Sequence, residues 1–375
     1  MHQTNEANTI TDNARTHKTI CLVCFGDLDK DRVCVQCKEK SDDTPSPAHH
    51  IPARSVLNKK YLLGKSIGEG GFGITYFAWN LNTGNRVAIK EYYPSGNVNR
   101  MPRSNSIEVN DKANQVSTNR SLQRFKHEAK TLVSLKNTDG IVSVQDFFSA
   151  NNTAYIVMEY LDGISLKTYH KTHGNIGMSK LCELILPVID GLQHVHQQGI
   201  IHRDISPDNI IITKQNTVKL IDFGAAKRIN NEGEMLSVVL KHGFAPEEQY
   251  RSQGIQGPWS DIYALAASMY YCITGKLPPE SVQRLHKDLI VKPSLQGCDI
   301  NPLQEVALMR ALSVFAKNRY QNMSQFKEAL FKSNKKSKDK IPSTTSINEE
   351  DTKISAHHKS KSNFLISKLL RKRKK

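Results

Sequence analysis

The chain has 375 residues, of which 38% are hydrophobic and 23% are charged, and its 52 Lys and Arg against 36 Asp and Glu give a net charge of +16. This composition excludes a collagen-like, coiled-coil or fully disordered chain. The longest apolar run, Leu181–Leu192, is too short for a membrane span and is interrupted by charged residues. The N-terminus lacks the basic and apolar segments of a secretory signal, so we expect a cytoplasmic protein.

Four cysteines follow residues 1–20, which we predict to be disordered. Their spacing is C-x2-C-x9-C-x2-C. Each C-x2-C pair can place two thiolates on one turn, and two such turns close a tetrahedral sulfur site. Disulfides would need an oxidising compartment, and a redox pair would not need a second C-x2-C nearby. We therefore predict a zinc-ribbon-like module over residues 21–37 that holds a structural Zn²⁺ through Cys21, Cys24, Cys34 and Cys37.

Residues 38–58 are polar and contain three prolines, which is typical of a linker. His49 and His50 lie within it, too far out of register with the cysteines to be needed as ligands. The next segment, Tyr61–Thr75, contains the glycine pattern G-x-G-x-x-G. That pattern alone fits a dinucleotide fold, a kinase loop or a chance turn. A dinucleotide fold needs a helix directly after the glycines, whereas residues 74–79 are aromatic and β-branched, so we predict a loop between two strands.

From this loop onward, over about 270 residues, the sequence resembles the eukaryotic-like protein kinase superfamily and is most similar to its bacterial Ser/Thr kinases. Each short motif could occur by chance, but the whole set, in this order and at the spacing of the family, is very unlikely to. The matching residues are Gly68, Gly70 and Gly73 of the glycine loop, Val87–Lys90, Glu128 in the helical pattern Leu122–Leu135, His202–Asn209, Asp222–Gly224, Ala245–Glu248, Asp261 and Arg319.

The resemblance implies an α+β, two-lobed protein kinase fold over residues 59–331, with a small, mostly antiparallel five-stranded lobe and a larger helical lobe. ATP would lie between them. In such a fold Lys90 holds the α- and β-phosphates, Glu128 pairs with Lys90, and Asp204 accepts the proton of the substrate hydroxyl. Asn209 and Asp222 would bind two Mg²⁺ ions. The implied ATP-binding residues are Gly68, Glu69, Gly70, Gly71, Phe72, Gly73, Thr75, Ala88, Lys90, Met158, Glu159 and Leu161, although 158–161 could also be an ordinary strand.

The sequence departs from the family pattern near the catalytic aspartate. Ser206 stands where many Ser/Thr kinases have a lysine that steadies the transferred phosphoryl group. Lys241 stands where the family usually has a threonine. Our hypothesis is that Lys241 supplies the missing cation as a catalytic residue; a surface lysine is the alternative.

The activation segment raises two further questions. Ser237 is the hydroxyl residue between Gly224 and Ala245, so it is the candidate regulatory phosphosite, where added charge could pair with Arg203. Either Glu247 or Glu248 could be the glutamate that pairs with Arg319. We favour Glu248, because Glu-Gln-Tyr follows as in the bacterial relatives.

Residues 332–375 hold 12 Lys and 2 Arg against 4 acidic residues and so carry +10 of the net charge. Such a segment buries too little apolar surface to offset chain entropy and is predicted to be disordered. Its end, Phe364–Leu370 followed by RKRKK, predicts contact with an anionic membrane surface or an import receptor, the latter in a host-cell nucleus if the protein is exported. A solvated tail is the competing interpretation. Because most of the charge lies in the tail, the charge no longer indicates a nucleic-acid enzyme. Nucleic-acid binding through the cysteine module or the tail is a side alternative that we do not favour, since residues 21–37 show no interleaving of basic and aromatic residues.

These patterns predict a bacterial protein Ser/Thr kinase that uses Mg-ATP to phosphorylate proteins and itself. A pseudokinase scaffold that binds partners through the cysteine module and the tail is the main alternative. It is disfavoured because Lys90, Asp204 and Asp222 are all present. A small-molecule kinase is a third reading, which the long activation segment disfavours.

Overall fold

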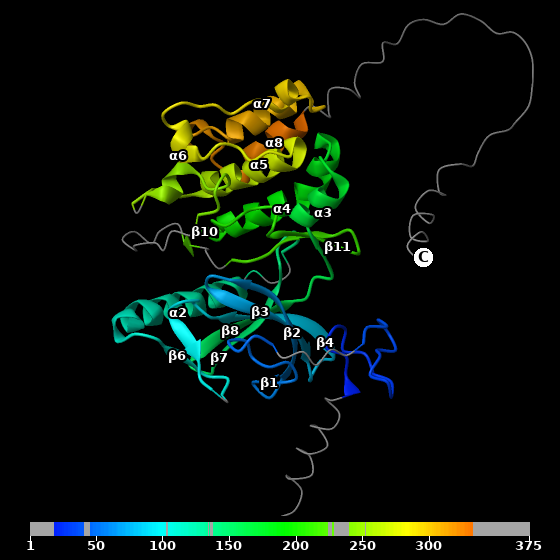
Figure 1. The fold of residues 1–375 in the computed structure, drawn as a ribbon. Helices are drawn as coiled ribbons and strands as arrows, with labels where there is room; N and C mark the ends of the chain where they lie inside the picture. The colour runs from blue at the N-terminus through cyan, green and yellow to red at the C-terminus, as the bar shows by residue number, and fades with distance from the viewer. Residues whose placement is uncertain are drawn as a thin grey trace, which may run out of the picture. The chain divides into compact units, whose positions relative to one another are not determined.

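The computed structural model describes residues 19–40, 46–102, 104–133, 135, 138–223, 227–228, 240–251 and 253–332. These residues form a β-rich N-terminal lobe and a mainly helical C-terminal lobe (Figure 1). The predicted two-lobed α+β fold is therefore confirmed. No helix in this part of the chain combines the length and apolar character needed to cross a bilayer.

The N-terminal lobe is built on one antiparallel sheet with the strand order β1-β2-β3-β4-β8-β7. Alternate side chains of its strands, such as those of Ile74, Tyr76, Val87 and Ile89, form one buried cluster, as the two-residue period of a strand dictates. The strands are β1 (Val56–Leu57), β2 (Tyr61–Gly70), β3 (Gly73–Asn80), β4 (Asn85–Tyr92), β7 (Val144–Ala150) and β8 (Thr153–Glu159).

Strand β1 is a sixth strand where the sequence predicted five, and it lies in the segment predicted to be a linker. The reason is the apolar content of that segment. Ile51 and Leu57 are only 1% and 2% exposed and belong to the core of the sheet. Residues 46–58 are thus an ordered part of the N-terminal lobe.

The polar connection after β4 is also structured. It forms a hairpin of β5 (Val98–Arg100) and β6 (Ile107–Val109), followed by helix α2 (Lys112–Val133). The helix begins at Lys112, not at Leu122 as its apolar periodicity predicted. The Asp111 side chain accepts a hydrogen bond from the Ala113 amide at 3.0 Å, which is the local signal for an earlier start.

The C-terminal lobe packs around helix α5 (Pro258–Thr274), which is buried on nearly all sides. A helix that is apolar all round is expected only inside a core. Short strands β9, β11 and β12 form a three-stranded sheet beneath the cleft, and β10 pairs with β13. The other elements are β9 (Gly163–Ser165), α3 (Leu166–His173), α4 (Met178–Gln197), β10 (Ile200–Ile201), β11 (Ile210–Thr213), β12 (Val218–Leu220), β13 (Lys227–Arg228), η2 (Glu247–Tyr250), α6 (Ser281–Arg284), η3 (Pro293–Gln296), α7 (Pro302–Ala311), η4 (Ala316–Asn318) and α8 (Met323–Phe331).

Candidate active site

A cavity of about 540 Å³ is lined by residues of both lobes. All twelve residues predicted to bind ATP line it, together with Asp204, Asp222 and Lys241. The twelve converge because strands β2, β3, β4 and β8 are neighbours in one sheet. Tyr160, between Glu159 and Leu161 in the predicted hinge, also lines the cavity. Four further lining residues were not predicted, and adjacency is the signal for three of them: Ile67 precedes Gly68, Ile211 follows Asn209 by two, and Ile221 precedes Asp222. The fourth is Val142.

The glycines of the loop between β2 and β3 serve different purposes. A Cβ atom added at Gly73 would lie 2.5 Å from the Glu91 carbonyl oxygen, so the close approach of β3 to β4 requires glycine there. At Gly68, Gly70 and Gly71 an added Cβ would meet nothing within 4 Å. Packing therefore does not demand these three glycines. The absence of side chains there lets a ligand approach the backbone closely.

Asp204 is held between a lysine and an amide. Its Oδ1 lies 3.1 Å from the Lys241 ammonium, and its Oδ2 accepts a hydrogen bond from Asn209 Nδ2 at 3.0 Å. The same ammonium donates to the Ser206 hydroxyl at 3.0 Å. Lys241, from the activation segment, therefore stands beside Asp204 and beside Ser206, the position at which many Ser/Thr kinases carry a lysine.

Lys90 and Asp222 form an ion pair across the cavity. Lys90 comes from β4 and Asp222 from the segment after β12, and Asp222 adopts a left-handed φ of 67°. Such a backbone conformation is costly for a non-glycine residue and is found where a site over-determines it. Glu128 lies on α2, but its side chain is outside the described part of the structure.

Asp261, at the start of α5, organises the backbone before Asp204. Its two oxygens accept the amide hydrogens of His202 and Arg203, each at 2.8 Å, and His196 Nε2 lies 2.7 Å from Oδ2. Burial opposes the charge on Asp261, but the hydrogen bond from His196 and the backbone donors hold its pKa below the usual range. An ionised carboxylate thus gathers two successive amides, and Arg203 takes a left-handed φ of 69° between them.

His202 joins the two halves of the site. Burial lowers the pKa of this imidazole, so it is neutral at pH 7. Its Nε2 donates to the Ile221 carbonyl at 3.2 Å, which leaves Nδ1 to accept the Asp204 amide at 3.3 Å. The ring also packs against Phe223 with centroids 4.5 Å apart. One side chain therefore links the loop of Asp204 to the segment of Asp222.

The activation segment ends in a buried ion pair between Glu248 and Arg319. The guanidinium donates to both carboxylate oxygens, at 2.7 and 3.0 Å, and to the carbonyl oxygens of Ser313 and Val314. Glu247 instead pairs with Arg251 at 2.7 Å. The structure thus settles which glutamate meets Arg319, and it is the one favoured from the sequence.

Replacing Arg319 with Ala is expected to lower the free energy of unfolding by about 3–5 kcal/mol, because Glu248 would remain charged and buried without its partner. Urea unfolding followed by circular dichroism measures this loss. Lys214→Ala is the control, since its ion pair with Asp162 has a similar length of 2.9 Å but the two side chains are 72% and 38% exposed, and its cost should stay below about 1 kcal/mol. Equal losses in the two variants would contradict the interpretation.

The four clustered cysteines come together at the N-terminus of the described chain. Their sulfur atoms all lie within 4.8 Å of one another, with Cys21 and Cys37 at 3.7 Å and Cys24 and Cys34 at 3.3 Å. A tetrahedral zinc with Zn–S bonds of about 2.3 Å would hold sulfurs roughly 3.8 Å apart. Amide hydrogens of Val23 and Gly26 point to Cys21 and Cys24. The donor set and its spacing therefore fit a closed sulfur site.

The cysteine segment packs on the N-terminal lobe. Phe25 contacts Phe77 and Trp79 of β3, with ring centroids 4.8 and 5.6 Å apart, and Phe77 in turn contacts Tyr160 at 4.4 Å. An added Cβ at Gly64 would lie 2.9 Å from the Leu22 carbonyl oxygen, so the small residue permits this approach. A chain of aromatic rings thus runs from the cysteines to the rim of the cavity.

Ser237 and residues 333–375 of the basic tail lie outside the described residues, as do residues 1–18. The structure therefore does not test the predictions about the Ser237 phosphosite and the tail. Arg203, the predicted partner of a phosphate on Ser237, lies beside Asp204, and burial lowers the pKa of its guanidinium. Gln249 donates to its carbonyl oxygen at 2.9 Å.

Comparison with known proteins gives consistent matches. The protein kinase domain family matches residues 61–375. Serine/threonine-protein kinase PknB of Mycolicibacterium smegmatis is 30% identical over 290 residues, which are 74% of this chain and 43% of that protein. Serine/threonine-protein kinase PknA of Nostoc sp. is 29% identical over 73% of this chain and 47% of that protein. A solved structure described as "PpkA-294 apo form" has a TM-score of 0.67 and 32% identity, and the match covers 75% of this chain and 99% of that one. The chain spans less than half the length of the two curated relatives.

Proposed function

The chain belongs to the protein kinase domain family, and from this membership we propose that it transfers the γ-phosphoryl group of Mg-ATP to Ser or Thr hydroxyls of proteins, including its own. The observation that carries the proposal is the convergence on one cavity of Lys90, Asp204, Asp222 and Lys241. Phosphoryl transfer needs positioning and charge neutralisation more than covalent chemistry, and this set supplies both.

Lys90 would bind the α- and β-phosphates. Asp222 and Asn209 offer the oxygen ligands that Mg²⁺ prefers. Asn209 donates a hydrogen bond to Asp204, and Asp222 lines the same cavity as Asp204. Mg²⁺ supplies neutralisation of the phosphate charge when it is bound with ATP. Lys90 and Asp222 form an ion pair, so a phosphate-binding cation and a metal-binding carboxylate lie side by side in the cavity.

Asp204 would orient the acceptor hydroxyl and take its proton. Lys241 would place an ammonium at the transferring phosphoryl group, in place of the lysine that many Ser/Thr kinases carry two residues after this aspartate. Its contact with both Asp204 and Ser206 supports this role. Glu128 would position Lys90, and Met158, Glu159 and Leu161 would hold the adenine.

The proposal is tested by incubating the chain with radiolabelled ATP, Mg²⁺ and a generic protein substrate, followed by phosphoamino-acid analysis. We expect label on phosphoserine or phosphothreonine, and loss of that label in Lys90→Met. Equal labelling of wild type and Lys90→Met would contradict the proposal. If neither protein transfers label although wild type binds ATP, the pseudokinase scaffold is the better account.

The clustered cysteines support a structural Zn²⁺ in residues 21–37. All four thiolates would be ligands. The amides of Val23 and Gly26, which donate to the sulfur atoms of Cys21 and Cys24, would stabilise and orient these thiolates. A module this small gains its folding energy from the metal. The packing of Phe25 on Phe77 supports a role in bracing the rim of the cavity. Contact of the basic tail with an anionic membrane or an import receptor, a cytoplasmic location, and phosphorylation of Ser237 stay predictions.

Cys24→Ser is expected to lower the zinc content by one ion per chain and to speed proteolytic cleavage within residues 19–40, because the module would lose its metal. Elemental analysis and timed proteolysis measure the two effects. Cys298→Ser is the control, since that thiol lies far from the cluster in sequence and contacts the Ile273 carbonyl oxygen. An unchanged zinc content in Cys24→Ser would rule out the sulfur site.

A further inference from the structure

Two histidines of the segment before the sheet hold the glycine-rich loop by its one acidic residue. His49 Nε2 lies 2.9 Å from Glu69 Oε1, and His50 Nε2 lies 3.0 Å from Glu69 Oε2. The three ligand atoms all lie within 4.8 Å of one another. Hydrogen bonds from His50 and His49 hold the pKa of Glu69 below its usual range. Two imidazoles and a carboxylate thus meet at one point.

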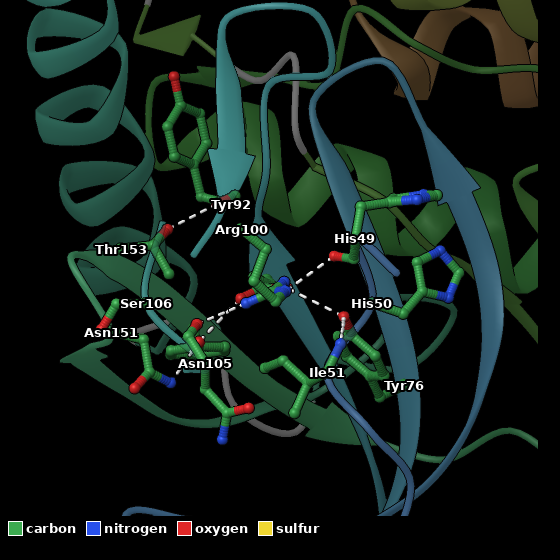
Figure 2. A network of polar contacts seen from close by, with 12 residues as sticks. His49, His50, Ile51, Tyr76, Tyr92, Arg100, Asn105, Ser106, Asn151 and Thr153 are labelled. Atoms are coloured by element: carbon green, nitrogen blue, oxygen red, sulfur yellow. Dashed lines mark hydrogen bonds and ion pairs between the residues drawn. The ribbon is translucent and has the colours of Figure 1, made fainter. Parts of the chain in front are cut away.

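The histidines are held there by a buried polar network (Figure 2). Arg100 donates from Nε to the His49 carbonyl oxygen at 2.8 Å and pairs with the buried Glu91 at 2.6 Å. On the other side, the Ile51 amide donates to the Tyr76 hydroxyl at 3.0 Å, which itself donates to Glu91 at 3.0 Å. Both ends of the histidine pair are therefore tied to one buried carboxylate, and the pair is preorganised.

The side chains themselves differ in exposure. The whole of His50 is only 6% exposed, and its ring packs edge-on to Tyr76. The side chains of His49 and Glu69 are 40% and 42% exposed. One side of the cluster is thus fixed in the lobe and the other is open to solvent, which gives an ion an entry path.

The backbone of the glycine-rich loop is anchored, but few of its side chains are restrained. Residues 68–70 pair with β3, and the amides of Tyr93 and Ser95 donate to the carbonyl oxygens of Phe72 and Gly71. Residues 67–73 contain no other charged side chain, and Gly68, Gly70 and Gly71 have open space where a Cβ would lie. Because Glu69 also lines the nucleotide cavity, whatever binds Glu69 adds a side-chain restraint to the loop over the cavity.

We propose that His49, His50 and Glu69 form a second metal site, which takes Zn²⁺ or a similar divalent transition metal and cross-links the segment before the sheet to the glycine-rich loop. Imidazole and carboxylate are the ligands of such ions, and three protein ligands leave at least one position for water. Metal occupancy would restrain the loop and so couple metal concentration to nucleotide entry. The site is separate from the four cysteines and goes beyond the proposed kinase activity.

The test begins with the full chain whose four cysteines already hold Zn²⁺. Further Zn²⁺ is titrated in, and competition with a chelator measures the affinity of any second site. His49→Ala and Glu69→Gln are the test variants, since both side chains are partly exposed and the fold should survive. We expect wild type to bind one ion more than the variants do. Removing a hydrogen-bond partner of a metal ligand costs about 10–100-fold in metal affinity, so removing a ligand itself should cost about 100-fold or more. His286→Ala and Glu108→Gln, exposed residues outside the cluster, are the matched controls.

Hydrogen exchange supplies a second readout that needs no ATP. Zn²⁺ should slow exchange of the amides of residues 68–72 in wild type and in the control variants but not in His49→Ala or Glu69→Gln. The proposal is overturned if wild type takes up no ion beyond the cysteine-bound one, or if the test variants match wild type in affinity and exchange. Because neither measurement involves phosphoryl transfer, such a result leaves the kinase proposal standing.

Discussion

Asp204→Asn lowers kcat for phosphoryl transfer by about 10²–10⁴-fold, the contribution of a positioned general base, while KM for ATP changes little. Asparagine keeps the shape of the side chain and can still meet Asn209 and Lys241, but it cannot accept the proton of the acceptor hydroxyl. The expected split between kcat and KM separates a chemical role from a role in nucleotide binding. Steady-state kinetics with radiolabelled ATP and a fixed protein substrate measures both constants.

The control for this variant is Asp190→Asn. Asp190 lies on α4, also pairs with a lysine, Lys327, and its side chain is 47% exposed. Its kcat should match wild type within the error of the assay. If Asp204→Asn kept the wild-type kcat, Asp204 would not be the base, and the chemistry assigned to this cavity would be wrong.

Lys241→Ala is expected to lower kcat by about 10²–10³-fold, the cost of removing one preorganised donor of charge stabilisation. The structure supplies the reason, because the ammonium lies 3.1 Å from Asp204 and 3.0 Å from the Ser206 hydroxyl. A surface lysine would have no such effect. Lys180→Ala is the control, since that lysine is exposed and pairs with Glu183 on the surface of α4.

Moving the lysine from position 241 to position 206 tests the same hypothesis more directly than removing it. The double variant Lys241→Thr, Ser206→Lys should recover activity relative to Lys241→Thr alone, because it returns an ammonium to the same side of Asp204. Ser206 is fully buried and in contact with Lys241, so shortening Lys241 opens the space that the new lysine needs. Full kcat in Lys241→Ala, or no recovery in a folded double variant, would refute the hypothesis.

The nucleotide cavity was largely predictable from the sequence because its residues occur in short local patterns. Thr75, Ala88 and Lys90 were assigned to the nucleotide site because they match positions of the kinase pattern, and the alternation of side chains along a strand is consistent with their lining one face. The missed residues Val142 and Ile211 carry no chemical signature. They are ordinary apolar residues that reach the cavity only because the fold brings their distant segments to it, Val142 from the residues before β7 and Ile211 from β11.

Two assignments near the activation segment needed the tertiary structure. Glu247 and Glu248 are adjacent in the sequence, and only the packing of η2 turns Glu248 toward Arg319. Lys241 could be matched to a motif position by counting, but its contact with Ser206 depends on how the segment folds back. Helix α2 was predicted too short because its first turns have no periodic apolar face, Val116 being 68% exposed, and because the helix begins at a cap formed by Asp111.

The sequence by itself determined the family resemblance, the order of the motifs and the identity of the chemical groups, because each of these resides in a local pattern. Only the tertiary structure decided that residues 46–58 belong to the sheet and that His49 and His50 meet Glu69. These residues are about twenty positions apart, and no local pattern sets the distance between them. That distance follows from burial of Ile51 and Leu57 and from the network around Glu91, which fix one segment against another.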